Sequence, residues 1–193
     1  MSTAVLSNVI TAINSFWFGA SDSIGYGGER AEWFTKNPAF DLEIEQRFIR
    51  VIEAAALGQL DMMAQSPEGA VALVVVLDQF PRNVYRGDAR AFAHDAQALN
   101  IASTALDKGF DEEVMAVMRK FLYLPFEHSE NVADQERAVQ LFERLGDDQG
   151  LEWALKHREV IVKFGRFPHR NAVLGRVSTV EEKHFLTLPG TSF

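Results

Sequence analysis

The sequence predicts an all-α protein, and three observations support this fold class. Apolar residues recur with the 3.6-residue period of amphipathic helices along most of the chain. The helix-start pairs Asn37-Pro38 and Ser66-Pro67 precede two of these segments, and glycine follows several of them. No stretch shows a convincing period-two alternation of a half-buried strand. We therefore expect antiparallel helical hairpins joined by short connections.

The expected helices follow one another along the whole chain. Several begin near a capping side chain or a proline, and most end at a glycine. The valine run at 74–76 could also form a strand, but its length and the flanking helix signals favour a helix. A glycine-rich loop covers 21–29, and Pro125 is expected to break a helix. The expected helical segments are 5–17, a turn at 33–34, 38–57, 68–80, 89–108, 111–124, 131–145, 150–164 and a short helix after the capping residue Thr179.

Length and composition limit the classes of function. A chain of 193 residues suits a single domain, 1–193, with a core of its own. Fifteen Phe and three Trp supply large side chains for that core. The net charge of -8 argues against nucleic acid and anionic membranes as partners, because both require a basic face. The absence of cysteine excludes disulfides, thiolate nucleophiles and cysteine metal sites.

The apolar segments also bear on the cellular compartment. Residues 1–13 contain no Lys or Arg and no continuous apolar stretch, so we expect no signal peptide. The longest apolar run, Ala70–Leu77, is shorter than the roughly 18 residues that a membrane span needs. We therefore expect a cytoplasmic protein, whose oligomeric state the sequence leaves open.

Two stretches, 78–87 and 165–176, share one pattern. Each follows a helix and contains Phe-Pro, then Arg-Asn, then a glycine. We interpret each as a short helical turn, in which proline sets the first position and glycine closes the end in a left-handed conformation. Free backbone N–H groups beside arginines would bind a carboxylate or a phosphate. The predicted ligand-binding residues are Asp78, Arg82, Arg86, Arg166, Arg170 and Arg176.

A structural explanation of the same arginines stays open. Arginine in a tight turn often pairs with a carboxylate of the protein or caps the carbonyls at the end of a helix. Asp78, Glu130 and Asp134 are the candidate partners. If the arginines are paired in this way, the two loops hold helices together and need bind no ligand.

The predicted break at Pro125 exposes a third polar group. His128 could act as a general base oriented by Glu130, with Ser129 as nucleophile or hydrogen-bond donor. Adjacent helical residues point about 100° apart, which argues against a direct dyad of Ser129 and His128. Alternatively, Ser129 caps the next helix and His128 bonds to a neighbouring helix. The candidate catalytic residues are His128, Glu130 and His169.

The sequence contains none of the common motifs for binding a metal or a cofactor. The chain contains no HExxH, Walker A, nucleophile-elbow or EF-hand pattern. A metal bound by His128, Glu130 and His169 is geometrically conceivable, but we expect no metal and no cofactor. The remaining histidines, at 94, 157 and 184, lie within helical patterns and are expected to be surface or packed residues.

Several longer motifs are spread over nearly the whole chain. They are FWFG at 16–19, LDQFPRN at 77–83, YLPF at 123–126, HSE at 128–130, DQER at 134–137, FGRFPHRN at 164–171, LGR at 174–176 and ST at 178–179. With these motifs the chain resembles a bacterial family called domain of unknown function 924. The resemblance implies an all-α fold similar to tetratricopeptide-like superhelices, and it supplies no reaction. Glu127 departs from the apolar residue expected there, and its carboxylate could raise the pKa of His128.

Three functions are therefore open for this chain. The first is a pocket for a small anionic molecule, built from both Phe-Pro loops and His128, with arginines as clamps and proton transfer by histidine and carboxylate. Whether such a pocket makes the protein an enzyme is left open. The second is a peptide- or protein-binding module whose arginines hold a terminal carboxylate. The third is a purely structural or oligomeric role.

Overall fold

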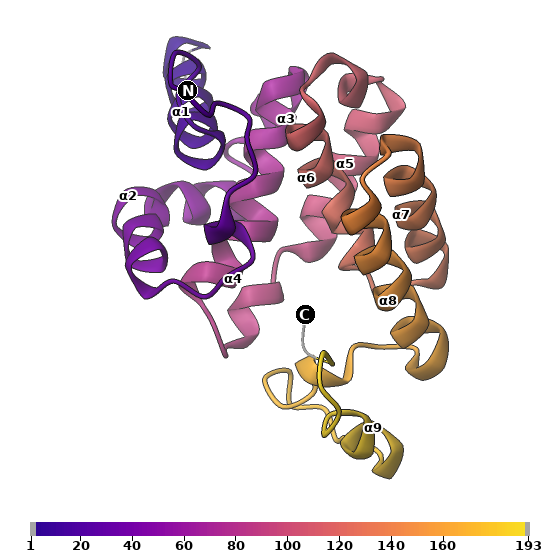
Figure 1. Cartoon of the computed structure of the whole chain (residues 1–193). Helices are drawn as coiled ribbons and strands as arrows, with labels where there is room; N and C mark the ends of the chain where they lie inside the picture. The colour runs from indigo at the N-terminus through magenta and orange to yellow at the C-terminus, as the bar shows by residue number, and fades with distance from the viewer. Residues whose placement is uncertain (1–2, 192–193) are drawn as a thin grey trace. The chain divides into compact units, whose positions relative to one another are not determined.

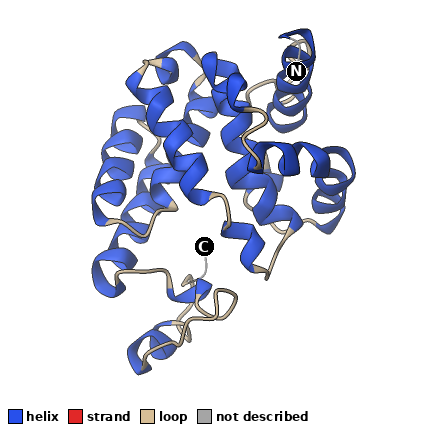
Figure 2. Ribbon diagram, turned by 180° about the vertical axis from the view of Figure 1, so that it is seen from behind, coloured by secondary structure: helices blue, strands red, loops and turns tan. Residues whose placement is uncertain are grey.

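The computed structural model describes residues 3–191, and within that range the chain forms helices and turns without a strand (Figures 1 and 2). The all-α prediction is confirmed. The chain divides into two compact units, which are Met1–Arg86 with Arg90–Pro125, and Gly87–Ala89 with Phe126–Phe193. A single domain and a tetratricopeptide-like arrangement stay predictions. No helix within 3–191 is long and apolar enough to cross a bilayer.

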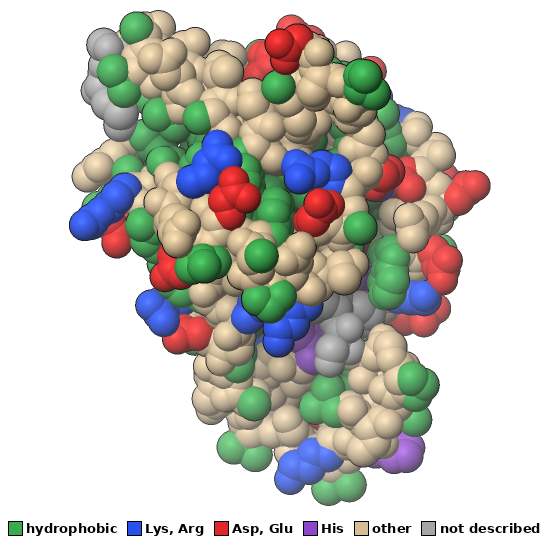
Figure 3. All heavy atoms as spheres, turned by 60° about the vertical axis from the view of Figure 1, so that its left-hand side comes forward, with side chains coloured by type: hydrophobic (Ala, Val, Ile, Leu, Met, Phe, Trp, Pro, Cys, Tyr) green, Lys and Arg blue, Asp and Glu red, His purple; other side chains and the backbone are tan. Residues whose placement is uncertain are grey.

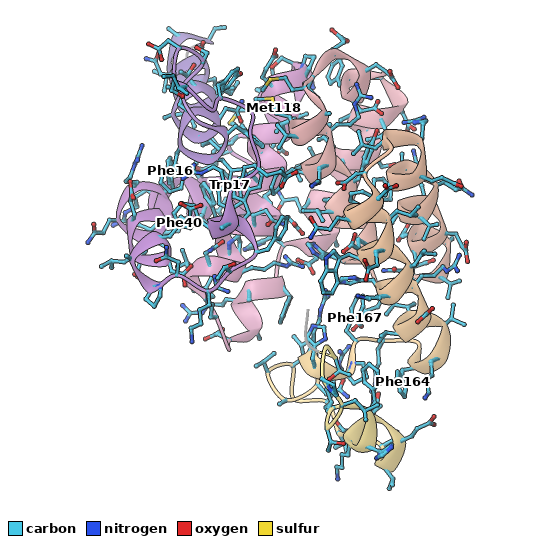
Figure 4. All side chains as sticks on the ribbon, viewed as in Figure 1. Phe16, Trp17, Phe40, Met118, Phe164 and Phe167 are labelled. Atoms are coloured by element: carbon cyan, nitrogen blue, oxygen red, sulfur yellow. The ribbon has the colours of Figure 1, made fainter. Side chains whose placement is uncertain are left out.

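The first unit is built around a helix that is buried from Gly69 to Val74. Its helices are α1 (Thr3–Phe18), α2 (Pro38–Ala56), α3 (Pro67–Val74), α4 (Phe80–Val84), α5 (Asp95–Asp107) and most of α6 (Ala116–Glu127). Helix α3 packs against α1 and α5, and α2 packs against α4. Phe16, Trp17 and Phe40 meet between α1 and α2 (Figure 4), with Trp17 fully buried.

The expected capping residues begin two helices of this unit. The Asn37 side-chain oxygen accepts hydrogen bonds from the backbone of Ala39 and Phe40 at the start of α2. Ser66 accepts one from Gly69 at 3.3 Å at the start of α3. These bonds satisfy donors that the first helical turn leaves without a partner.

The predicted helix 68–80 differs from the observed one in its length and regularity. Helix α3 passes into a π-helix, Val75–Gln79, and then into α4 without a break. Pro81 lacks the N–H that would bond to the carbonyl four residues earlier, and its ring would crowd that carbonyl. The wider π turn immediately before Pro81 relieves this conflict. The first Phe-Pro stretch is a short helix with Pro81 in its first turn and Gly87 at a φ of +78°, as predicted, but it continues directly from the π-helix.

Two other predicted boundaries were also wrong. The segment 89–108 is divided into a 3₁₀ helix, Ala89–Phe92, and α5. The segment 111–124 begins as a 3₁₀ helix, Phe110–Glu113, and α6 then continues through Pro125 to Glu127. Burial of the residues on both sides of Pro125 offsets the one hydrogen bond that proline removes.

The second unit contains the hairpin of α7 (Val132–Leu145) and α8 (Asp148–Phe164), which lie side by side in Figure 1. Gly146 and Gly165 end these helices at φ values of +73° and +68°, as their positions predict. A 3₁₀ helix, Pro168–Arg170, follows, and then α9 (Val180–Phe185). The capping box of Thr179 and Glu182 starts α9, which confirms that prediction.

Replacement of Gly69 by alanine should destabilise the protein. The added methyl group would meet the backbone oxygen of Met63 and would lie 2.7 Å from the Ser66 hydroxyl, and a backbone atom cannot rotate away. We expect a loss of about 1–3 kcal/mol in the free energy of urea unfolding. The exposed neighbour Glu68→Ala is the control and should change it by less than about 1 kcal/mol. Equal effects of the two changes would contradict the close contact.

Candidate functional site

The residues predicted to bind a ligand are divided between the two units. Asp78, Arg82 and Arg86 belong to the first unit, whereas the residues from His128 to Arg176 belong to the second. Each group is therefore described by itself. Convergence of the two Phe-Pro stretches with His128 stays a prediction.

In the first unit, Arg82 is held by two carboxylates. Its two terminal nitrogens bind both oxygens of Asp95 at 2.8 and 2.9 Å, and one of them lies 3.2 Å from Asp78 Oδ1. Asp78 is fully buried and also accepts a hydrogen bond from the side chain of Gln79. Burial alone would lower the pKa of Arg82, but the charges of Asp78 and Asp95 outweigh it and raise the pKa. The Arg82 charge is thus compensated inside the unit.

Arg86 connects the end of α4 to the start of α2. Its Nε and Nη2 donate to the two oxygens of Asp41 at 2.7 and 2.9 Å, and Asn83 donates to the same carboxylate at 2.7 Å. Burial would raise the pKa of Asp41, but the hydrogen bonds from Arg86 and Asn83 lower it overall. This geometry is that of a bidentate arginine–carboxylate pair.

In the second unit, Arg166 is bound to Glu182 in the same manner. Its Nε and Nη2 donate to the two carboxylate oxygens at 2.6 and 2.8 Å, and Nη2 also donates to the carbonyl of Val177. Glu182 additionally accepts the backbone N–H of Thr179 at 2.7 Å. The hydrogen bond from Arg166 is the main reason that the pKa of Glu182 falls to about 2. Arg166 therefore connects the second Phe-Pro loop to the start of α9.

Glu130 holds the other side of that loop. Its two oxygens accept from Arg176 at 2.6 and 2.9 Å, and Oε1 also accepts the backbone N–H of Phe167 at 2.7 Å. Burial would raise the pKa of Glu130, but the bonds from Arg176 and Phe167 lower it overall. Sequence reasoning assigned Glu130 to the orientation of His128. In the structure its carboxylate is engaged by the loop.

The structural alternative thus accounts for four of the predicted anion-binding arginines. Each makes two short hydrogen bonds to an acidic side chain of its own unit, so an incoming anion would have to displace an established partner. An anion-binding role for these arginines stays a prediction, and their pairing weighs against it. The four are Arg82, Arg86, Arg166 and Arg176.

A different polar group remains around Phe167, on the loop that follows α8 (Figure 4). The edge of the Phe167 ring faces His157 at a centroid distance of 5.6 Å, and His169 lies 5.6 Å away. The Arg170 guanidinium lies over the same ring at 4.4 Å. His128 is 6.4 Å from His157, between ring centroids. We call His128, His157, His169, Arg170 and Glu127 the histidine cluster.

His157 is the electrostatic centre of the cluster. Only 5% of its surface is exposed, and burial is the main cause of a pKa lowered to about 3. Nearby His128, Arg170 and His169 lower this pKa further, while a hydrogen bond with the Trp153 carbonyl acts in the opposite direction. Nδ1 lies 2.9 Å from that carbonyl oxygen and 3.1 Å from Glu127 Oε1. Because both neighbours are acceptors, we assign the proton to Nδ1, which leaves Nε2 as an acceptor.

The segment after His128 is fixed by α7. Ser129 donates its hydroxyl proton to Asp134 at 2.7 Å and accepts the backbone N–H of Asn131. The N-cap of α7 is Asn131. The prediction that Ser129 caps this helix was therefore wrong. The buried Gln135 amide donates to the carbonyls of Glu127 and Ser129 at 2.6 and 2.7 Å. It thereby satisfies carbonyls at the end of α6 that lack helical partners.

Sequence reasoning overlooked three residues of this region. His157 was treated only as a surface or packed residue, and a lone histidine in a helical pattern gives no stronger signal. Glu127 was expected to act on His128, whereas the structure places its carboxylate 3.1 Å from His157 Nδ1. Gln135 was seen only as part of a family motif. Among residues 3–191, no group of three or more His, Cys, Asp or Glu is arranged as a metal site.

The depressed pKa of His157 predicts an acid-dependent loss of stability. The folded state holds this imidazole neutral until about pH 3, whereas the unfolded chain protonates it below the ordinary value of 6.5. Its contribution is therefore complete above pH 6.5 and is lost as the pH falls towards 3, by about 1.4 kcal/mol per pH unit. Urea unfolding of the wild type should show this additional slope relative to His157→Gln. The exposed His184→Gln should keep the wild-type slope, and equal slopes for all three proteins would refute the assignment.

Comparison with known proteins places the chain among uncharacterised relatives. A solved structure of a protein of unknown function from Agrobacterium tumefaciens is 38% identical, with a TM-score of 0.84, over 96% of this chain and 98% of that one. No curated protein matches the chain. The model of the bacterial proteins of unknown function, domain of unknown function 924, matches residues 13–190. The motif resemblance is thereby confirmed, and the chain belongs to the bacterial family domain of unknown function 924.

Proposed function

We propose that the histidine cluster of the second unit binds a small organic or inorganic anion and takes up a proton with it. The proposal depends on the observation that His157 is buried and neutral. Glu127 lies beside its Nδ1, and His128, His169 and Arg170 lie around it. A negative charge bound nearby would raise the pKa of this imidazole and so favour its protonation. This proposal keeps His128, His169 and Arg170 among the predicted site residues.

Each member of the cluster has a distinct role in this proposal. Arg170 supplies permanent charge at a position set by its contact with Phe167. The half-buried His128 and His169 carry the exchangeable proton, because histidine titrates near neutral pH. Glu127 stabilises positive charge on His157 when the bound anion raises its pKa.

This arrangement supports acid–base chemistry on a bound anion. A proton that moves between a histidine nitrogen and the ligand leaves an imidazolium whose charge a fixed carboxylate stabilises. Glu130 and Arg176 contribute indirectly, because they hold the backbone of Phe167. Glu130 is thus proposed as a positioning residue, in place of the proton-transfer role first assigned to it.

Two probe anions, succinate and inorganic phosphate, test the proposal by NMR of the histidine ring protons. We expect saturable shifts at His128, His157 and His169 and none at the exposed His184. Affinity should rise as the pH falls below neutrality, by at most about tenfold per pH unit for one coupled proton. Saturation by succinate alone would indicate a carboxylate ligand, and saturation by phosphate alone a phosphate ligand.

Variants separate a binding site from a structural cluster. Arg170→Gln should weaken binding by about tenfold or more, because it removes charge-assisted hydrogen bonds. Arg170→Lys keeps the charge and should retain part of the affinity. The matched control is Arg158→Gln, since Arg158 pairs with Glu136 on the α7–α8 hairpin. The absence of saturable shifts for both anions, or an unchanged affinity in folded Arg170→Gln, would overturn the proposal and favour a structural role.

A further inference from the structure

The first unit contains a cleft that the proposed function does not use. It has a volume of about 520 Å³, within the range of small-molecule sites. The upper half of Figure 3 shows this side of the unit, where basic and acidic side chains stand in pairs around apolar ones. The lining residues come from the end of α1, the loop that follows it and the first half of α2. The charged ones are Arg30, Glu32, Glu43 and Arg47.

Two stacked phenylalanines form the apolar part of the cleft. The rings of Phe16 and Phe40 lie 5.1 Å apart at an interplanar angle of 9°. The Arg47 guanidinium lies over Phe16 at 4.7 Å, and the Arg30 guanidinium lies over Phe40 at 5.7 Å. Each arginine is therefore positioned by an aromatic face, which leaves the edge of its guanidinium group for hydrogen bonding.

Both arginines retain donors for a ligand. Arg30 uses Nη1 to bind the carbonyls of Phe16 and Trp17 at the end of α1, and its Nη2 is 3.8 Å from Glu32, beyond hydrogen-bond distance. Arg47 uses Nη1 to bind Glu43 at 2.8 Å. Within residues 3–191, their other guanidinium N–H groups make no hydrogen bond. These donors suit a carboxylate.

The two acidic residues determine which ligand fits. Glu43 is exposed and Glu32 is half-buried, and the pair of Glu43 and Arg47 is a surface pair one helical turn apart. Such pairs are weak, so a ligand carboxylate can replace Glu43 at little cost. The released glutamate then remains in the cleft, where it would repel a simple anion and attract an ammonium group.

We propose that this cleft binds a short peptide with free ends, whose carboxylate meets Arg30 and Arg47 and whose ammonium meets Glu32 and Glu43. The lining carries two positive and two negative side chains, which matches a ligand with one charge of each sign. The parts of the Phe16 and Phe40 rings that line the cleft then contact the atoms between the two ends. The site lies wholly in the first unit and does not depend on the histidine cluster.

Three forms of one tripeptide test the proposal by isothermal titration calorimetry on the full chain. Trialanine carries both terminal charges, N-acetyl-trialanine lacks the ammonium, and trialanine amide lacks the carboxylate. We expect trialanine to bind saturably and each blocked form to bind about tenfold more weakly or worse, because each loses charge-assisted hydrogen bonds. Equal binding of the three forms, or no saturable binding of trialanine, would overturn the proposal.

Substitutions on α2 locate the binding. Arg47→Gln and Glu43→Gln should each weaken trialanine binding by about tenfold, the first through the carboxylate and the second through the ammonium. Arg50→Gln is the matched control, because Arg50 is 89% exposed on the same helix and pairs with Glu53 outside the cleft. All three changes affect exposed surface pairs, so the variants should fold. Wild-type affinity in both cleft variants would place binding elsewhere and refute the assignment.

Discussion

Bidentate contacts between arginine and an acidic side chain are the constraint on which both units depend. In each case the two partners come from different elements, as with Arg86 of the segment after α4 and Asp41 of α2. The carboxylates of these pairs are largely withdrawn from water, so each is tolerated only while its arginine stays in place. These contacts therefore fix the relative placement of elements that apolar packing alone would leave adjustable.

In the second unit, these contacts position the residues of the histidine cluster. Glu130 holds the backbone of Phe167 on one side, and Glu182 holds the preceding Arg166 on the other. The phenylalanine between them is fully buried and carries His157, His169 and Arg170 around its ring. Glu130 and Glu182 thus fix the positions of the residues around Phe167, although they are not themselves proposed to transfer a proton.

The fold was largely predictable from sequence, whereas the candidate site was predictable only in part. Caps such as Asn37 and stop signals such as Gly146 act within one turn, so local sequence reveals them. The pairing of Glu130 with Arg176 spans 46 positions and depends on packing that no local pattern encodes. The pKa of His157 is lowered mainly by burial and further by residues distant in sequence, so its sequence neighbours gave no indication of it. Pro125 was misjudged because burial around it outweighs an intrinsic preference against helix.

The π-helix Val75–Gln79 makes the first unit sensitive to the length of the chain as well as to its composition. A π turn corresponds to one residue inserted into an α-helix. Deletion of one residue there would restore a regular helix and rotate everything after it by about 100° about the helix axis. Arg82 and Asn83 would then face away from Asp95 and Asp41 although every one of these side chains was still present. The position of these pairs thus depends on the number of residues in this segment as well as on their identity.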